Sequence, residues 1–458
     1  MRKLWVLAAL CAAQFMAIVN ISVVNVALPA IQKDLDTSLA GLQWVLNAFT
    51  ICISALTLAG GSLGDRFGRK RVFVTGLAAF IVGTVVCAVS VNLGMLITGR
   101  LIQGIAAALL LPGSLSILAQ TFTDPAERVR RIGIWAAVSA VGLVIGPVVG
   151  GVLIQAFGWP SLFWLCVPLG VTALIATLVF VPESANPEHA AIDPLGQILA
   201  MLSLGSLSFG LIRLGDKGWD DTVALIVTGT ALVLFVVFIV VELRTRTPML
   251  PVRLFADRSF AAMNFASASL GFGPYTMYAF LALYLQQERD FSALSAGLAF
   301  VPMSIATAIV APLAGRWVGA SGPVPAMLAG YGSSAVGLAG VALFDAHTSW
   351  FLMGPVFVLI GVGMGLSMTP TTNGAVDAVP RERSGIASAT INTTRQTGLA
   401  IGIALLGAMV SAQDNFLTGL RLVAAVTALV SLIAVVYILA GRVATRPRTP
   451  AEATASAS

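Results

Sequence analysis

The sequence has very little charge for its length. Only 10% of its 458 residues are Asp, Glu, Lys or Arg, whereas 58% are hydrophobic, and the mean hydropathy is +0.94. A soluble domain carries roughly 25% charged residues, so this chain cannot cover a water-facing surface. Its apolar runs are near-continuous over about 20 residues and lack the two-residue alternation of barrel strands. The sequence therefore predicts an all-α polytopic membrane protein.

Histidine is almost absent, and this argues against an embedded enzyme. The two histidines, His189 and His347, fall in expected loops, and no acid pair is expected inside a span to bind a metal. No Gly-Lys loop that could cradle a phosphate is present, so ATP is not the expected fuel. We therefore expect no catalytic site, no metal and no cofactor. All four cysteines lie within apolar runs, which indicates packing residues rather than a disulfide framework.

Fourteen apolar runs are long enough to cross a bilayer. Their approximate limits are 4–31, 40–62, 72–91, 94–120, 131–156, 160–181, 194–214, 222–242, 260–286, 294–318, 324–344, 350–371, 384–411 and 420–440. The first run is long and many others follow it, so we interpret it as an uncleaved span rather than a secretory signal.

Basic residues are unevenly distributed between the expected loops on the two sides. With the N-terminus inside, most of the 26 Lys and Arg residues fall in cytoplasmic segments, and only Arg100 and Arg395 fall within spans. The positive-inside rule then predicts that both termini are cytoplasmic. The net charge of +6 is thus a sign of topology, so we expect a lipid bilayer and no nucleic acid as the partner.

A dense block of glycine and charge separates the second and third spans. It reads Gly61-Ser62-Leu63-Gly64-Asp65-Arg66-Phe67-Gly68-Arg69-Lys70-Arg71. Such charge is too costly inside a bilayer, so we expect a tight loop at a membrane face, with glycines in the left-handed turn geometry. The spacing G-x-x-G-D-R-x-G-R-K-R resembles the signature loop of the major facilitator superfamily. The alternative is a plain positive-inside loop.

The resemblance implies that this block is a conformational latch. The latch residues are Gly61, Gly64, Asp65, Arg66, Gly68, Arg69 and Lys70. The carboxylate of Asp65 is expected to contact the positive N-terminal end of a helix in the other half of the protein. In this chain that helix starts near Ser384. Such a contact would favour the outward-open state and would break during the transport cycle.

Two further motifs of the same family lie within spans. The stretch Gly142-Leu143-Val144-Ile145-Gly146-Pro147-Val148-Val149-Gly150-Gly151 resembles the antiporter signature G-x-x-x-G-P-x-x-G-G, which implies an exporter. Its small residues permit close helix approach, and an ordinary packing face is the alternative. The stretch Arg100-Leu101-Ile102-Gln103-Gly104 resembles R-x-x-Q-G, which implies that Arg100 and Gln103 take part in proton coupling. The alternative for Arg100 is snorkelling to the interface.

The first span departs from the pattern of fourteen-span drug:proton antiporters. That family commonly has L-D-x-T-x-V-N-V-A-L-P where this chain has Val19-Asn20-Ile21-Ser22-Val23-Val24-Asn25-Val26-Ala27-Leu28-Pro29. Asn20 takes the place of the acid and cannot exchange a proton. All 20 acids of the chain map outside the expected membrane core, which favours neutral, zwitterionic or anionic lipophilic substrates. Arg100 and Arg395 could pair with anionic groups.

Several amides and amphipathic aromatics are candidates for lining a substrate cavity, from their positions in the spans alone. They are Asn20, Asn25, Gln43, Trp44, Asn47, Trp135, Asn264, Tyr275, Tyr278, Asn392 and Arg395. The alternative for each of them is helix packing.

The resemblance covers nearly the whole chain and implies two six-helix bundles with inverted repeats plus two extra central helices. We predict an N-terminal six-helix bundle at 1–181, a two-helix insertion with linkers at 182–250, a C-terminal six-helix bundle at 251–440 and a disordered cytoplasmic tail at 441–458. The expected protein is a monomeric cell inner membrane exporter of drugs, antibiotics or other lipophilic small molecules. It would work by alternating access and proton-coupled antiport. The alternatives are a dedicated exporter of one metabolite or natural product, without proton coupling at the first span, and a transporter-like receptor.

Overall fold

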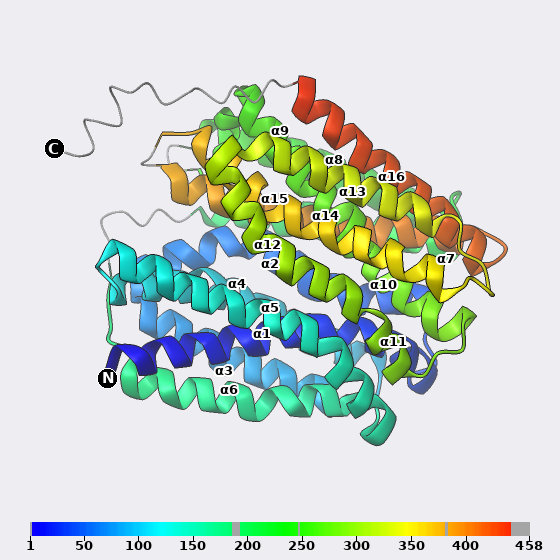
Figure 1. Cartoon of the computed structure of the whole chain (residues 1–458), viewed down its shortest axis with the longest axis horizontal. Helices are drawn as coiled ribbons and strands as arrows, with labels where there is room; N and C mark the ends of the chain where they lie inside the picture. The colour runs from blue at the N-terminus through cyan, green and yellow to red at the C-terminus, as the bar shows by residue number, and fades with distance from the viewer. Residues whose placement is uncertain (1, 186–192, 246–247, 381–382, 441–458) are drawn as a thin grey trace.

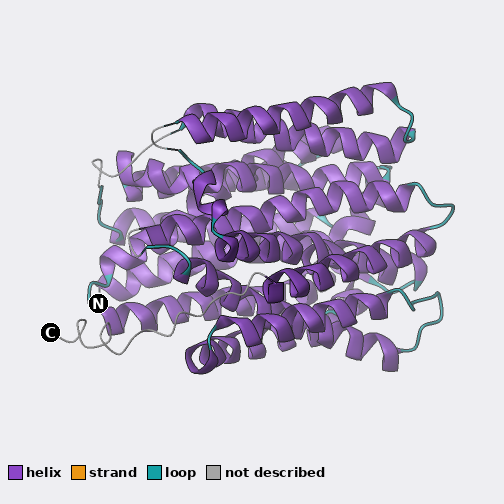
Figure 2. Cartoon of the chain, turned by 90° about the horizontal axis from the view of Figure 1, so that it is seen from above, coloured by secondary structure: helices purple, strands orange, loops and turns teal. Residues whose placement is uncertain are grey.

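The computed structural model describes residues 2–185, 193–245, 248–380 and 383–440, and these residues are almost entirely helical. Figure 1 shows long helices that run side by side across the molecule. Figure 2, turned by 90°, shows the same arrangement with connections gathered at the two ends of the helices. The tail predicted at 441–458 lies outside the described residues. The all-helical fold agrees with the prediction from the sequence.

Long α-helices follow one another along the chain, with shorter helical segments between residues 252 and 299. The first eight are α1 Arg2–Asp34, α2 Leu39–Phe67, α3 Arg69–Ala88, α4 Leu93–Thr121, α5 Pro125–Phe157, α6 Pro160–Phe180, α7 Pro194–Lys217 and α8 Thr222–Arg244. The later elements are η2 Val252–Ala256, α9 Arg258–Leu270, η3 Gly271–Tyr275, α10 Thr276–Leu283, η4 Tyr284–Glu288, α11 Ala293–Ala299, α12 Val301–Ser321, α13 Pro323–Val341, α14 Trp350–Asp377, α15 Ser384–Ser411 and α16 Phe416–Ala440.

Short polar side chains fix where many helices begin. Each of these residues accepts a hydrogen bond from a backbone N–H in the first turn, which satisfies one of the donors that a helix start leaves free. The capping residues are Ser38 for α2, Asn92 for α4, Asp124 for α5, Asp193 for α7, Asp221 for α8, Asp257 for α9, Ser292 for α11 and Ser349 for α14. The caps therefore lie in the polar connections that the hydropathy pattern placed between spans.

Twelve helical segments among the described residues are long and apolar enough to cross a membrane. Two further predicted spans complete the set of fourteen. The span predicted at 260–286 is formed by α9, η3, α10 and η4 together, and π-helical turns at Gly271–Tyr275 and Tyr284–Glu288 interrupt it. The other is α15, whose first half is rich in Thr, Asn, Arg and Gln. Both are helical over a spanning length despite these departures.

The helices form two groups with a hairpin between them. Helices α1–α6 pack on one another, as do α9–α16, and Figure 1 shows the two groups lying side by side. In the hairpin, α7 packs against both α2 and α15, whereas α8 packs mainly on α7. The outer side of α8 exposes Ile226, Val233, Phe235 and Val236. These apolar side chains are suited to contact with lipid.

The connection between α2 and α3 is tighter than the sequence predicted. We expected a loop over residues 61–71, but α2 continues to Phe67 and α3 begins at Arg69. Only Gly68 separates them, with a φ of 103° that favours glycine. The helix extends past the apolar run because its last turns are polar and keep their backbone hydrogen bonds. We call the side of the protein that carries this connection the basic face, and the other side the opposite face.

Candidate functional site

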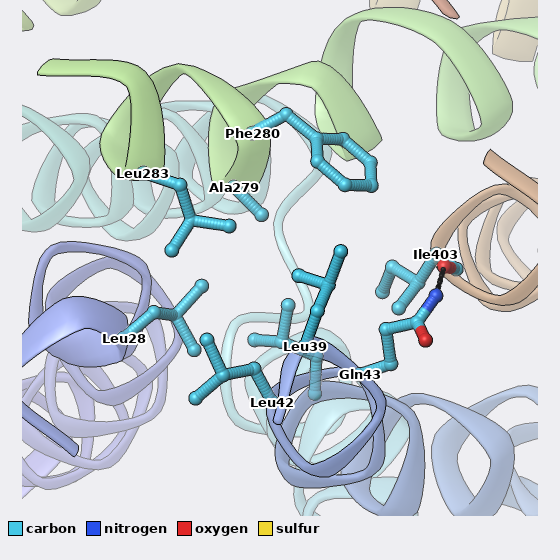
Figure 3. Close-up of a pocket in the computed structure, with 9 residues that line it drawn as sticks. Leu28, Leu39, Leu42, Gln43, Ala279, Phe280, Leu283 and Ile403 are labelled. Carbon is cyan, nitrogen blue, oxygen red and sulfur yellow. Dashed lines mark hydrogen bonds between the residues drawn. The ribbon is translucent and has the colours of Figure 1, made fainter. Parts of the chain in front are cut away.

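An apolar cluster closes the contact between the two helix groups at the opposite face. In Figure 3, Leu28, Leu39 and Leu42 of the first group face Phe280 and Leu283 of the second. The cavity left between them is about 10 Å³, room for no more than about one water molecule. A drug-sized ligand needs a pocket of roughly 300–1,000 Å³, so none can pass here in this state.

Gln43 joins α2 to α15 beside this cluster. Its Nε2 donates to the backbone carbonyl of Ile403 at 2.6 Å and to that of Ala404 at 3.3 Å. Its Oε1 is buried without a partner among the described residues. The structure therefore places Gln43 in a contact between the helix groups, where it helps to hold the opposite face closed.

The predicted antiporter motif packs α5 against two different helices. Three glycines of α5 pack against α1: Gly142, Gly146 and Gly150. An added Cβ on Gly146 would come 2.8 Å from the side chain of Ser22 in α1. Gly151 faces α11 in the other helix group, where an added Cβ would be 2.6 Å from the carbonyl oxygen of Ala293.

On the same contact, the carbonyl of Pro147 lies against Gly297, again too close for a Cβ. Small residues on both helices thus allow backbone-to-backbone contact between the two groups.

The predicted latch residues lie together at the basic face, where Asp65 is bonded to Arg69 of the same connection. Asp65 Oδ1 accepts from Arg69 Nε at 2.8 Å and lies 2.6 Å from its Nη2. At the start of α15, an added Cβ on Gly385 would meet nothing within 4 Å, and Ile386 is 45% exposed. The contact predicted between Asp65 and this helix end stays a prediction.

Glu183 completes the α2–α3 connection and was missed from the sequence. Its carboxylate accepts from the backbone N–H groups of Lys70 at 3.0 Å and Arg71 at 3.1 Å, which caps the start of α3. The carboxylate lies where a side chain on residue 68 would be, so Gly68 is needed for space as well as for its φ. An acid directly after a span, on a face rich in basic residues, was the available signal.

Arg100 is the centre of a buried polar network rather than a snorkelling residue. It is 2% exposed, and its Nη1 donates to Asn20 Oδ1 at 2.8 Å and to Gln103 Oε1 at 2.9 Å. Its Nε donates to the carbonyl of Val45 at 3.1 Å, and the guanidinium lies 4.3 Å from the ring centroid of Phe49. The two motif residues and the residue that replaces the family's acid are thus in direct contact.

The second helix group has a related but separate polar cluster. Arg395 donates to Asn392 Oδ1 one turn earlier on α15. Asn264 of α9 accepts from Thr394 at 3.2 Å, which ties α9 to α15. Tyr275 points its hydroxyl at the sulfur of Met368. In the part of the chain that the structure describes, neither Arg100 nor Arg395 forms an ion pair with a carboxylate.

Four other predicted cavity residues carry buried polar atoms that lack a partner among the described residues. They are Asn20, Asn47, Trp135 and Tyr278. An unpaired buried donor or acceptor costs roughly 1–3 kcal/mol, so these groups are available to water or to a ligand.

The two remaining cavity candidates, Trp44 and Asn25, contact other parts of the chain. Trp44 packs on Phe209 of α7, with ring centroids 6.1 Å apart, and the amide of Asn25 donates to Ile21 on its own helix. A packing role fits Trp44 best.

Known proteins resemble the chain over most of its length. The family model described as "Major Facilitator Superfamily" matches residues 10–403. The chain belongs to the major facilitator superfamily. It is therefore a multi-pass membrane protein that transports small molecules, which supports the prediction of a transporter rather than an enzyme.

Named relatives within the superfamily are resistance proteins. The chain is 34% identical to the multidrug resistance protein Stp of Mycobacterium tuberculosis strain H37Rv, over 87% of this chain and 74% of that protein. It is 33% identical to a methylenomycin A resistance protein of Bacillus subtilis strain 168, over 88% and 87% of the two chains. It is 30% identical to the tetracenomycin C resistance and export protein of Streptomyces glaucescens, over 87% and 74%.

Solved transporter structures share the fold at low identity. A peptide transporter crystallised with sulfate is similar with a TM-score of 0.71 at 16% identity, covering 96% of this chain and 95% of that one. The human organic anion transporter MFSD10 is similar with a TM-score of 0.65 at 15% identity, covering 95% and 99%. These likenesses support the fold of the chain and carry no information on its substrate.

Proposed function

We propose that this protein is a secondary active exporter of lipophilic small molecules that works by alternating access. The observation that carries the proposal is the contact at the opposite face, where motif residues Pro147 and Gly151 meet α11 and Gln43 meets α15. A contact of this kind can open only if the two helix groups separate. Three relatives named for resistance or export of drugs and antibiotics support export as the direction.

The two groups of helices correspond to the moving bodies in this proposal. They are the N-terminal bundle at 1–181 and the C-terminal bundle at 251–440, with the insertion at 182–250 between them. The basic face is cytoplasmic by the positive-inside rule, so both termini are inside. The structure is then in a state closed to the outside, and Asp65 bonds Arg69 of the same connection. When the basic face closes, Asp65 would move to the N-terminal end of α15.

Proton-coupled antiport is the energy source that the family motifs favour, but Asn20 cannot be the coupling group. Its side-chain oxygen is occupied by Arg100, and an amide has no proton to exchange near neutral pH. The protein would then act as a monomer that couples proton entry through another group. If no proton is coupled at all, a dedicated exporter of one metabolite or natural product becomes the better description.

The charge of the central residues favours neutral or anionic substrates. Arg100 and Arg395 carry positive charge without a carboxylate partner in the described chain. The unpaired groups of Asn47, Trp135 and Tyr278 can hydrogen-bond a neutral molecule. A permanently cationic drug would find no buried acid in this region and would be repelled by the two guanidinium groups.

The test is accumulation of methylenomycin A, tetracenomycin C and neutral dyes in pump-deficient bacteria that express the chain. The comparison variant is Asp65→Asn, with and without a protonophore. Lower accumulation that requires Asp65 and disappears with the protonophore would support proton-driven export. Lower accumulation that survives the protonophore would support export without proton coupling. No change for any compound, with the protein present in the membrane, would contradict drug export.

A further inference from the structure

Two acidic side chains are buried against each other at the basic-face end of the α7–α8 hairpin. Asp193 precedes α7 and is 7% exposed, and Glu242 lies in the last turn of α8 and is 2% exposed. Acidic residues are almost never this buried unless a cation pairs with them. None of the ion pairs in the described chain includes either residue.

Each carboxyl group uses one oxygen to hold the backbone. Asp193 Oδ1 accepts from the N–H of Gly196 at 2.8 Å and caps α7. Glu242 Oε2 accepts from the N–H of Leu250 at 2.8 Å, in the segment that leads to α9. The pair thus connects the start of α7, the end of α8 and the entry to the second helix group.

The other two oxygens lie against the same glycine and have no donor among the described residues. Asp193 Oδ2 and Glu242 Oε1 are both buried, and neither has a partner among the described residues when both acids are treated as acceptors. Both lie against Gly196, where an added Cβ would be 2.7 Å from Asp193 Oδ2 and closer still to Glu242 Oε1. The absence of a side chain on Gly196 leaves room for two carboxyl groups side by side.

Among the described residues, the neighbouring basic side chains do not pair with Asp193 or Glu242. Arg244, at the end of α8, is exposed and forms no ion pair with another described residue. Arg253 of η2 donates instead to the carbonyl of Leu243 at 3.3 Å. Asp193 itself is the charge that acts on Glu242 across the gap. Two ionised carboxylates that are buried against the same glycine would repel each other strongly.

We propose that Asp193 and Glu242 bind one shared proton and form a proton site that fastens the hairpin to the entry of the second helix group. With the proton in place, the two free oxygens become the donor and acceptor of one carboxyl–carboxylate hydrogen bond. Without it, repulsion drives the end of α8 from the start of α7 and loosens the hold on Leu250. The site lies apart from Arg100 and Arg395 and does not depend on what the protein transports.

The sign of the pH dependence follows from this arrangement. The folded protein holds a proton that the unfolded chain releases at neutral pH, so the site stabilises the fold at lower pH. That stability is lost as the pH rises and the shared proton leaves. An amide at either position supplies a permanent N–H donor in place of the proton, so Glu242→Gln should remove the dependence.

The test is the thermal unfolding midpoint of the purified full-length protein in detergent, from about pH 6 to about pH 9. We expect the midpoint of the unchanged protein to fall by about 2 °C or more over this range, and that of Glu242→Gln to change much less. Asp193→Asn should behave in the same way, because Asn still caps a helix. If one variant fails to fold, the other decides.

The matched control is Asp221→Asn. Asp221 caps α8 as Asp193 caps α7, but its partner is a cation: Arg213 donates to it at 2.8 Å and lowers the pKa of the Asp221 carboxyl. This variant should keep the pH slope of the unchanged protein. Equal slopes in the unchanged protein and in both Glu242→Gln and Asp193→Asn would overturn the proposal, as would a midpoint that does not fall with rising pH.

Discussion

An alanine at position 151 should force the two helix groups apart at the opposite face. The added Cβ would lie 2.6 Å from the Ala293 oxygen and from the Leu294 Cα, whereas ordinary contacts begin at 3.4 Å. The helices must therefore separate by about 0.8 Å, or the closed state must accept the overlap. Overpacking of this kind costs roughly 1–3 kcal/mol. If the cost falls only on the closed state, the equilibrium moves toward the open state by roughly 5- to 150-fold.

The assay is alkylation from outside the cell by a membrane-impermeant maleimide. The target is a cysteine introduced by Leu42→Cys, because Leu42 lines the small cavity in the closed contact and is buried there. Labelling should be slow in the otherwise unchanged protein and roughly 5- to 150-fold faster with Gly151→Ala, since each 1.4 kcal/mol is a factor of ten.

Two glycines of the same helix serve as controls. An added Cβ on Gly133 meets nothing within 4 Å, so Gly133→Ala should leave the labelling rate unchanged. Gly146→Ala would clash with Ser22 of its own helix group, so it should lower stability without opening the opposite face. Equal labelling rates for Gly151→Ala and Gly133→Ala would show that close packing at Gly151 does not hold the opposite face closed.

Three further variants test the polar networks. Asn20→Asp would place a carboxylate beside Arg100, so the variant should gain export of a permanently cationic dye. Export of the dye that stays at background would count against the proposed preference for neutral or anionic substrates. Gln103→Leu removes a partner of Arg100 and should lower stability by about 1.5–3 kcal/mol, seen as a lower unfolding midpoint; an unchanged midpoint would contradict the network. Glu183→Ala removes the cap of α3, so it should lower the free energy of unfolding by about 0.5–2 kcal/mol and slow export. Glu183→Gln should retain part of the stability and part of the export rate. Equal effects of the two variants would argue against capping.

Hydropathy predicted the helices well because a bilayer permits little else. Every predicted span has a helix, and family membership and the helical fold are confirmed. The pattern missed what does not change hydropathy. The apolar run at 260–286 contains a π-helical turn at Gly271–Tyr275, which includes Pro274. In this turn Gly271 packs against the backbone of Arg395. The helical course of Gly61–Phe67 was missed for the opposite reason, since polar residues can extend a helix beyond the membrane.

The candidate site was predicted in part. Arg100 and Gln103 were recognised by their motif, but their contact with Asn20 joins spans far apart in the sequence and needed the fold. The same holds for Gly151, whose motif indicated close packing without naming α11 as the partner. Gln43 and Trp44 were assigned to a cavity from position alone. Gln43 lines the small closed cavity and also bonds α15, whereas Trp44 packs on Phe209, because position along a span does not fix the direction of a side chain.

The proposed export is tested most directly by uptake of neutral, lipophilic antibiotics into inverted membrane vesicles that contain this protein. With the basic face cytoplasmic, as we propose, it points outward in such vesicles, so export becomes uptake. A proton-driven exporter would begin uptake when the vesicle interior is made acidic, and Asp65→Asn would reduce this uptake sharply. Vesicles that contain the folded protein but take up none of these antibiotics, whether or not a proton gradient is imposed, would contradict drug export.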